Sequence, residues 1–302
     1  MSERMSDEAL RRMASVIALA VALGLVVVKV WAWLATDSIS LLTSAADGLV
    51  DVVASSVTFA GVRYAARPAD RGHRYGHGKA EAVAAFVQAL LLAGAALGLG
   101  VESIHRLFVP QALNQTGFGI WVIVGSSVIA AGLVGMQTLV VRRTGSTAIA
   151  ADRAHYVTDV AVNLAVLVAL LLERFLGWTR ADAIGALAIS VYMLWNARGM
   201  AAHALLQLLD RELDEADRAR IEAAVLGCDG VKGLHDLRTR NGGDRFFVEF
   251  HVEVDGSLTV EEGHTIGDNA EKAVQRLFQA ADVVAHLEPA GIKDERLDDL
   301  VA

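Results

Sequence analysis

The stretch SLLTSAADGLVDVVAS, residues 40–55, places Asp47 and Asp51 inside an apolar run that predicts a membrane-spanning helix. Residues four apart lie on the same face of a helix, one turn from each other. The stretch ADRAHYVTDV, residues 151–160, repeats this spacing with His155 and Asp159 in a later apolar run. A charged group at mid-membrane costs about 3 kcal/mol even on gentle insertion scales, so four ionisable groups at that depth indicate a functional site.

Three carboxylates and one imidazole form a suitable tetrahedral set for Zn²⁺, which binds His nitrogen and Asp oxygen at about 2.0 to 2.2 Å. The imidazole argues against Mg²⁺ and Ca²⁺, which prefer oxygen ligands, whereas Fe²⁺, Co²⁺, Mn²⁺ and Cd²⁺ stay compatible with the set. The alternative is that the acids lie at helix ends in the membrane interface, paired with arginines or with Lys29. The repeated spacing favours the metal site but leaves both interpretations open.

The composition indicates a membrane protein. Hydrophobic residues make up 54% of the 302 residues, and the mean hydropathy is +0.42, which is too apolar for an ordinary soluble chain. A helix needs about 20 residues to cross the hydrocarbon. We therefore predict six spans, at residues 13–35, 39–65, 80–105, 118–141, 148–176 and 181–206. No small-residue cleavage site follows the first apolar run, so we expect no removable signal peptide.

Basic residues gather on one side of the predicted bundle. The segment from Arg63 to Lys79, the loop after the fourth span and the N-terminal segment lie on this side and hold Arg63, Arg67, Arg71, Arg74, Lys79, Arg142, Arg143, Arg4, Arg11 and Arg12. The opposite loops are poor in Lys and Arg. By the positive-inside rule, both termini are expected in the cytoplasm.

After residue 207 the chain becomes acidic and polar. The last 95 residues hold 11 Lys and Arg against 22 Asp and Glu, which disfavours nucleic acid as a partner and favours cations. Periodicity predicts elements in the order αββαβ at residues 214–226, 231–239, 246–254, 259–278 and 282–287, with Gly242 and Gly243 in a hairpin turn. We therefore expect a six-helix transmembrane domain at 1–207 and a cytoplasmic α+β domain at 208–302.

Cys228 is the single cysteine, which excludes a disulfide within one chain and a zinc site built from cysteines. Metal must therefore be held by histidines and carboxylates. The loop residues Asp70, His73 and His77 gather three such side chains within eight positions. The alternative for this loop is a solvated basic segment whose histidines contact lipid phosphate or become charged at low pH.

Together these motifs resemble the cation diffusion facilitator family, in particular its bacterial zinc and ferrous-iron efflux pumps. The resemblance covers almost the whole chain. Residues 40–55 and 151–160 carry it, together with RPADRGHRYGHGKAE at 67–81, LLDRELD at 208–214 and HDLRTRNGG at 235–243.

The resemblance implies a homodimer in a bacterial inner membrane, with a metallochaperone-like cytoplasmic domain. It implies that Asp47, Asp51, His155 and Asp159 form a transport site, alternately open to cytoplasm and periplasm, from which metal leaves in exchange for protons. Protons and metal compete for the same atoms, because His titrates near pH ~6.5 and ligands must lose their protons to bind metal.

The resemblance also implies metal sites outside the membrane. The loop of Asp70, His73 and His77 would be one of them. A two-zinc site in the cytoplasmic domain would use residues from its strands and second helix: His235, His251, His264, His286 and Glu288. Glu288 stands where these pumps usually have Asp, which puts its bridging geometry in doubt. For His251 and His264 the alternative is simple packing or helix capping.

We therefore predict a divalent metal/proton antiporter, not an enzyme, with zinc as transported ion and as a structural or regulatory ion. A membrane metalloenzyme is one alternative, but the chain lacks H-E-x-x-H, and four protein ligands leave no position for a catalytic water. A membrane-tethered metal sensor is another, but it would not explain acids inside the spans. The expected partners are a second copy of the chain, membrane lipid and divalent metal ions.

Overall fold

The computed structural model describes residues 6–36, 39–109, 117–178, 180–278, 280–291 and 296–300. The chain divides into two compact units. Met1–Pro68 and Ala80–Leu205 form the first, and Ala69–Lys79 with Leu206–Ala302 form the second. The loop 69–79, which we expected to belong to the membrane domain, is thus grouped with the C-terminal part of the chain.

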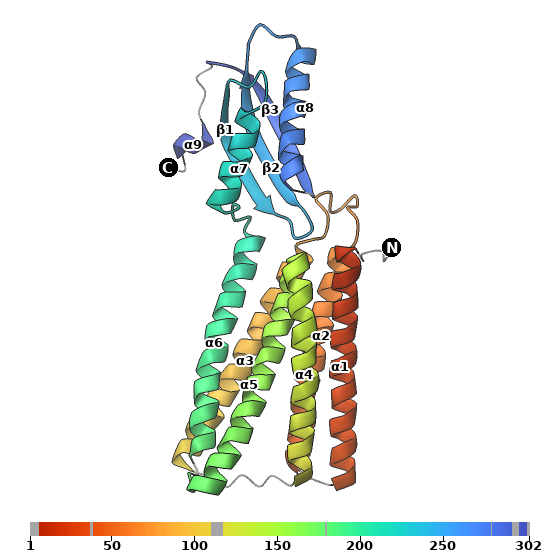
Figure 1. Cartoon of the computed structure of the whole chain (residues 1–302), viewed down its shortest axis with the longest axis vertical. Helices are drawn as coiled ribbons and strands as arrows, with labels where there is room; N and C mark the ends of the chain where they lie inside the picture. The colour runs from red at the N-terminus through yellow and green to blue at the C-terminus, as the bar shows by residue number, and fades with distance from the viewer. Residues whose placement is uncertain are drawn as a thin grey trace. The chain divides into compact units, whose positions relative to one another are not determined.

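The first unit is a bundle of long helices that run alongside one another (Figure 1). They are α1 (Asp7–Thr36), α2 (Ile39–Ala65), α3 (Ala80–Phe108), α4 (Gly117–Thr144), α5 (Thr147–Leu176) and α6 (Ala181–Leu208). Among the residues that the structure describes, five of them are long and apolar enough to cross a membrane by length and composition. The sixth, α6, has 28 residues, but Asn196, Arg198 and His203 interrupt its apolar sequence.

Small residues line the faces on which these helices meet. Ala14, Ala18 and Ala22 of α1 are almost fully buried. A Cβ added to Gly61 of α2 would lie 2.5 Å from the Cβ of Ala84 in α3. Small side chains let helix backbones approach closely, which is how helices associate in lipid, where no hydrophobic driving force acts between them.

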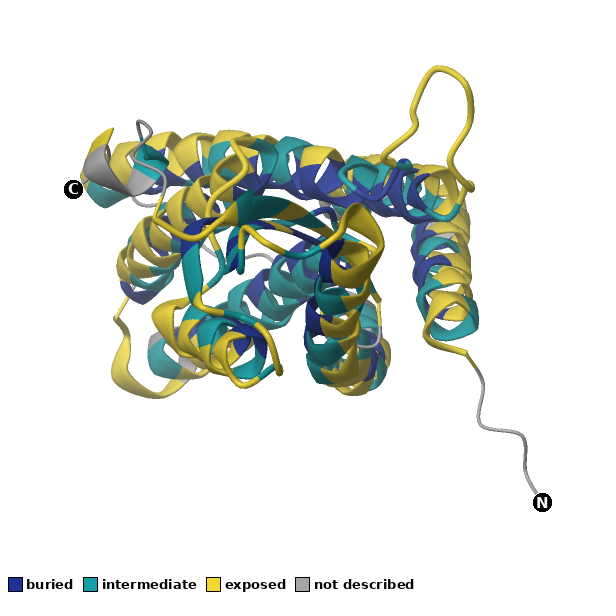
Figure 2. Ribbon diagram, turned by 90° about the horizontal axis from the view of Figure 1, so that it is seen from above, coloured by how far each residue is buried: buried dark blue, intermediate teal, exposed yellow. Residues whose placement is uncertain are grey.

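Large apolar side chains point away from the bundle. The exposed set includes Trp31, Trp121 and Trp195, which are 64%, 76% and 72% exposed, and Figure 2 shows exposed residues along the outward sides of the helices. Such an exposed apolar surface is unusual for a protein in water and is expected for one in lipid.

The second unit contains a three-stranded sheet and two long helices. Its elements are α7 (Glu215–Leu226), β1 (Gly233–Asn241), β2 (Phe246–Val254), α8 (Val260–Leu277), β3 (Ala281–Pro289) and the short α9 (Leu297–Leu300). The strand order is β1-β2-β3, with β1 antiparallel and β3 parallel to the central β2. The αββαβ order is therefore confirmed, with α9 as an addition that the sequence did not predict.

Alternating apolar residues of β2 form the centre of this unit. Val248, Phe250 and Val252 are buried against Ile221 of α7 and Val274 of α8. The hairpin turn forms as predicted: the N–H of Gly242 donates to the carbonyl of Arg245 at 2.8 Å, and Gly243 has a φ of +96° that favours glycine. The strands of this sheet carry four of the candidate metal ligands, His235, His251, His286 and Glu288.

Loop 69–79 packs against the same hairpin. Tyr75 lies edge-on to Phe247 of β2, with ring centroids 5.4 Å apart. The guanidinium of Arg240 lies 4.7 Å from the centroid of each of these rings. A Cβ on Gly78 would collide with the carbonyl of Gly242, so the two backbones touch.

Candidate metal sites

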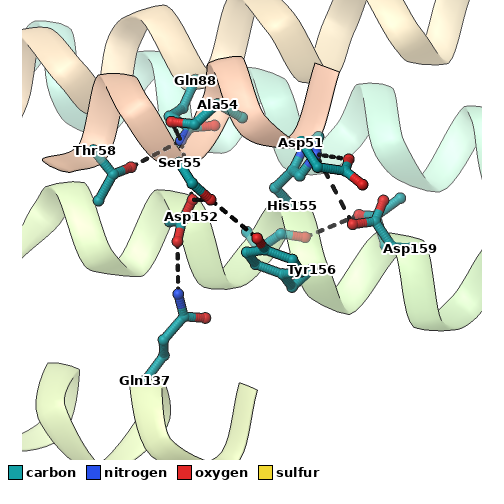
Figure 3. Close-up of polar contacts among 12 residues, drawn as sticks. Asp51, Ala54, Ser55, Thr58, Gln88, Gln137, Asp152, His155, Tyr156 and Asp159 are labelled. Atoms are coloured by element: carbon teal, nitrogen blue, oxygen red, sulfur yellow. Dashed lines mark hydrogen bonds and ion pairs between the residues drawn. The ribbon is translucent and has the colours of Figure 1, made fainter. Parts of the chain in front are cut away.

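The first candidate site lies between α2 and α5. Nε2 of His155 is 3.1 Å from Oδ1 of Asp51 and 3.9 Å from Oδ2 of Asp159, and ligand atoms of all three residues lie within 4.8 Å of one another (Figure 3). Two ligand atoms of a tetrahedral zinc ion are about 3.3 Å apart, given bonds of about 2.0 to 2.1 Å. The group is thus close to the geometry that one small metal ion requires.

The site is partly closed to solvent. The side chain of His155 is 6% exposed, and those of Asp51 and Asp159 are 19% and 32% exposed. Nδ1 of His155 and Oδ2 of Asp159 are buried and have no hydrogen-bond partner among the described residues. Buried polar atoms without partners are costly, so Oδ2 of Asp159, which faces Nε2 of His155, is suited to a ligand that would satisfy it.

Asp47, the fourth predicted ligand, is not part of this three-residue group. It is exposed and lines a cavity of about 270 Å³ together with Glu102, Arg106 and Asp182. Arg106 bridges two helices there, with Nε 2.7 Å from Glu102 of α3 and an Nη atom 3.4 Å from Asp182 of α6. The role of Asp47 as a metal ligand therefore stays a prediction.

The second candidate site is in loop 69–79. Nδ1 of His73 lies 3.4 Å from one carboxylate oxygen of Asp70, and Nε2 of His77 lies 3.5 Å from the other. The backbone N–H groups of His73 and Gly72 both donate to Asp70 at 2.8 Å. These hydrogen bonds, that of His73 first, hold the pKa of Asp70 below its usual value. The loop therefore presents an ionised carboxylate beside two imidazoles.

The third candidate site lies on the sheet. His235 of β1 pairs with His251 of β2, and Glu288 of β3 reaches both: its carboxylate oxygens are 3.2 Å from Nε2 of His235 and 2.8 Å from Nδ1 of His251. Side chains of directly paired residues point to the same face of a sheet. The longer Glu side chain, whose geometry the sequence left in doubt, thus brings its carboxylate to both imidazoles.

The two remaining predicted ligands differ from each other. His286 pairs with His251 in the register of β2 and β3, its ring centroid lies 4.7 Å from that of His251, and its Nε2 is 3.5 Å from Glu288. It lies at the exposed edge of this site, with 64% of its side chain exposed. His264, on α8, is 74% exposed and lies 3.8 Å from Asp268 of the same helix. The structure does not bring His264 into the group.

Sequence reasoning missed one carboxylate on the sheet. Oε1 of Glu253, on β2, lies 3.4 Å from Nδ1 of His235, and Arg296 holds the same oxygen at 2.6 Å. His235 therefore stands between two carboxylates. The signal was the spacing of His251 and Glu253, which puts both side chains on one face of a strand.

Sequence reasoning also missed a buried polar cluster next to the first site. Asp152 is fully buried and accepts hydrogen bonds from Gln137 at 2.7 Å and from Ser55 and Gln88 at 3.3 Å. The hydroxyls of Ser55 and Tyr156 lie 3.0 Å apart (Figure 3). The available signal was the position of Asp152, three residues before His155 and thus on nearly the same helix face.

The helix bundle holds one carboxylate–imidazole group, and the small α+β unit holds another. These features define a membrane protein that handles metal ions. The family model of the cation efflux transmembrane domain matches residues 15–209, and that of the cytoplasmic domain of cation efflux proteins matches residues 213–290. The chain belongs to the cation efflux family, and it is a membrane-embedded protein.

Named relatives agree with this family. The chain is 42% identical over 279 residues to the cation-efflux pump FieF of Salmonella arizonae, and equally to that of Salmonella choleraesuis, covering 92% of this chain and 93% of each relative. Among solved structures, the zinc form of the putative zinc transporter CzrB is 34% identical, with a TM-score of 0.26 over 28% of this chain and 99% of that chain.

Proposed function

We propose that this protein exports divalent metal ions, Zn²⁺ or a chemically similar ion, from the cytoplasm in exchange for protons. The observation that carries the proposal is the convergence of Asp51, His155 and Asp159 from two helices inside an apolar bundle. One imidazole and two carboxylates suit Zn²⁺, and they also accept Fe²⁺, Co²⁺, Mn²⁺ or Cd²⁺. Membership of the cation efflux family supports transport as the use of this group.

Proton exchange follows from the chemistry of the ligands. The nitrogen and oxygen atoms that would hold the metal are the atoms that bind protons, so either occupant displaces the other. A site that faces the cytoplasm and the periplasm in turn would therefore load metal on one side and protons on the other. Asp51 and Asp159 would hold the cargo, and His155 would do so through Nε2, the atom that faces Asp51.

The orientation and assembly are parts of the same proposal. The Arg-rich loops support termini in the cytoplasm of a bacterial inner membrane, and the second unit matches a family model described as a cytoplasmic domain. We infer a homodimer from the family resemblance, with zinc bound by His235, His251 and Glu288 as a structural or regulatory ion. A molecular mass twice that of the chain, measured by light scattering in detergent, would support the dimer.

Metal flux into vesicles tests the transport proposal. Purified protein is reconstituted into vesicles with an acidic interior and a zinc indicator inside, and Zn²⁺ is added outside. We expect uptake that needs the pH gradient and that is lost in Asp51→Ala and Asp159→Ala, whereas Glu261→Ala, an exposed acid of α8, keeps it. Unchanged uptake in the Asp51 and Asp159 variants would refute the assignment.

The same experiment separates the two alternatives. A membrane-tethered sensor would bind zinc without carrying it, so binding without gradient-driven uptake would favour that function. The group of Asp51, His155 and Asp159 by itself has the three protein ligands of a catalytic zinc. Hydrolysis of ester or peptide substrates by the purified protein, lost in Asp51→Ala, would favour the metalloenzyme.

A further inference from the structure

The buried cluster around Asp152 repeats the contact between α2 and α5 one helical turn away from the metal group. Asp51 and Ser55 are four residues apart on α2, and their partners on α5 are His155 and, three residues before it, Asp152. As residue numbers rise on α2 they fall on α5, so the Asp51–His155 contact and the Ser55–Asp152 contact are successive steps between the same two helices (Figure 3). Each turn advances by about 5.4 Å.

Asp152 also gathers the two neighbouring helices. Gln137 of α4 donates to one of its oxygens and Gln88 of α3 to the other, and the amide group of Gln88 also donates to the carbonyl of Ala54 and to Thr58, both on α2. Four helices therefore meet at one carboxylate. Among the described residues, the hydrogen-bond donors to this carboxylate carry no positive charge.

A buried carboxylate of this kind is not explained by stability. Taking it out of water is costly, and well-packed apolar residues often stabilise a helix bundle as well as or better than buried charges. Directional hydrogen bonds between fixed positions define how far one helix is shifted along the axis of its neighbour, which apolar packing does not define. The shift between α2 and α5 decides whether Asp51 faces His155 and Asp159.

We propose that Asp152 is a positioning residue of the metal site: by fixing Ser55 of α2 against α5, with Gln88 and Gln137 holding the carboxylate in place, it sets the distance between Asp51 and the imidazole of His155. This inference rests on the proposed function, because it assumes that Asp51, His155 and Asp159 bind the transported metal. Asp152 itself does not touch the metal in this arrangement, since its oxygens are occupied by hydrogen-bond donors.

The test measures the geometry of the site as well as its affinity. In the full-length chain carrying His73→Ala, His77→Ala, His235→Ala and His251→Ala, the first site is isolated, and Co²⁺ serves as a probe because its visible absorption reports coordination geometry. We expect Asp152→Asn and Ser55→Ala to change the Co²⁺ spectrum and to weaken Zn²⁺ binding by about 10- to 100-fold, the usual effect of altering partners behind metal ligands. Ser126→Ala is the matched control, because the Ser126 hydroxyl bonds only to Val122 of its own helix among the described contacts.

The outcomes are distinguishable. A wild-type Co²⁺ spectrum and wild-type Zn²⁺ affinity in both Asp152→Asn and Ser55→Ala would overturn the positioning role while leaving the transport proposal intact. If Asp152→Asn does not fold, Ser55→Ala decides, since it removes one hydroxyl and leaves the carboxylate in place. Wild-type binding in Asp51→Ala, in the same background, would instead overturn the proposed function.

Discussion

Nε2 of His155 lies 3.1 Å from Oδ1 of Asp51, although 104 positions separate the two residues in the chain. The contact joins the second and fifth helices at the depth where each carries its pair of ionisable residues. It brings Asp51 together with His155 and Asp159 into one group of candidate ligands, whereas Asp47 lies outside that group.

Asp47 provides a direct test of the ligand number. If Asp47 completes the site, as the sequence predicts, Asp47→Ala should lower zinc affinity by more than about tenfold. Mutation of a residue that only hydrogen-bonds to a metal ligand already costs about that much, and loss of a ligand itself should cost more. Isothermal titration of the chain in which only the first site is intact measures this. An unchanged affinity would assign Asp47 to the cavity that it lines with Glu102 and Asp182.

The loop site should bind its own zinc ion. Replacing His73 and His77 together by alanine should lower the metal bound per chain by about one equivalent, because two of its three ligands are lost. Metal analysis of dialysed protein measures the stoichiometry. His105→Ala, which changes a histidine of α3 outside the three groups, is the control, and an unchanged stoichiometry in the double variant would contradict this site.

The carboxylate of the loop site should stay ionised in neutral and mildly acidic solution. The pKa of Asp70 is held below its usual value of 3.8 by backbone N–H groups. The ionised carboxylate therefore stabilises the folded loop at every pH above the unfolded-chain pKa. This stabilisation is lost only as pH falls through the lower folded-state pKa. Between pH ~7.5 and ~5.5 Asp70 therefore takes up no proton, and a fall in zinc affinity over this range does not come from its carboxylate.

Zinc titration at several pH values, in the chain whose other sites are removed, checks this. Asp70→Asn should bind zinc more weakly, yet its affinity should fall with decreasing pH as steeply as that of the unsubstituted loop. A much flatter pH dependence in Asp70→Asn would show that Asp70 takes up the protons.

The length of Glu288 should matter on the sheet. Glu288→Ala should remove zinc from the sheet site, because this carboxylate is shared by His235 and His251. Glu288→Asp should retain it with lower affinity, since a shorter side chain must reach the same two imidazoles. Competition with a chelator measures both. Equal loss of zinc in the two variants would mean that only the longer side chain fits.

A partly buried ion pair should stabilise the bundle. Glu81 of α3 is 3% exposed; one of its carboxylate oxygens lies 3.3 Å from Arg11 and the other accepts from Ser146 at 2.5 Å. Glu81→Ala leaves Arg11, whose side chain is 18% exposed, with the carbonyl of Thr144 as its remaining partner among the described residues, so the loss should be smaller than the about 3 to 5 kcal/mol typical of a fully buried pair. Unfolding in detergent, followed by circular dichroism, should show this loss, and the exposed Glu261→Ala should show almost none.

The elements of the fold could be predicted because their signals are local. Apolar runs locate the six helices, although α1 begins at Asp7 rather than near Met13, since a helix continues into polar sequence beyond the membrane. Alternation in residues 246–254 predicts β2 with its exact bounds. The four-residue helix α9 has too few residues for any periodicity to show.

The site was predictable only in part, because its geometry depends on how helices pack. The spacing of His155 and Asp159 shows that they share a face, but not that Asp51 meets them while Asp47 lies apart. Gln88 and Gln137 are polar residues of ordinary kind, and nothing in the sequence marks them as partners of Asp152. Likewise, Tyr75 gave no sign that its loop packs on the hairpin of β1 and β2.

That packing affects how shortened forms of the protein behave. A chain ending at residue 207 would lack Phe247 and Arg240, the surface on which Tyr75 rests, and the Asp210 carboxylate that lies 2.7 Å from Nζ of Lys79. Removing the C-terminal part would thus remove these contacts of Tyr75 and Lys79, in a segment more than a hundred residues upstream. Zinc lost on truncation would come from the sheet site, which is removed, and from the site in loop 69–79, which loses its supporting contacts. Only single substitutions can separate these two losses.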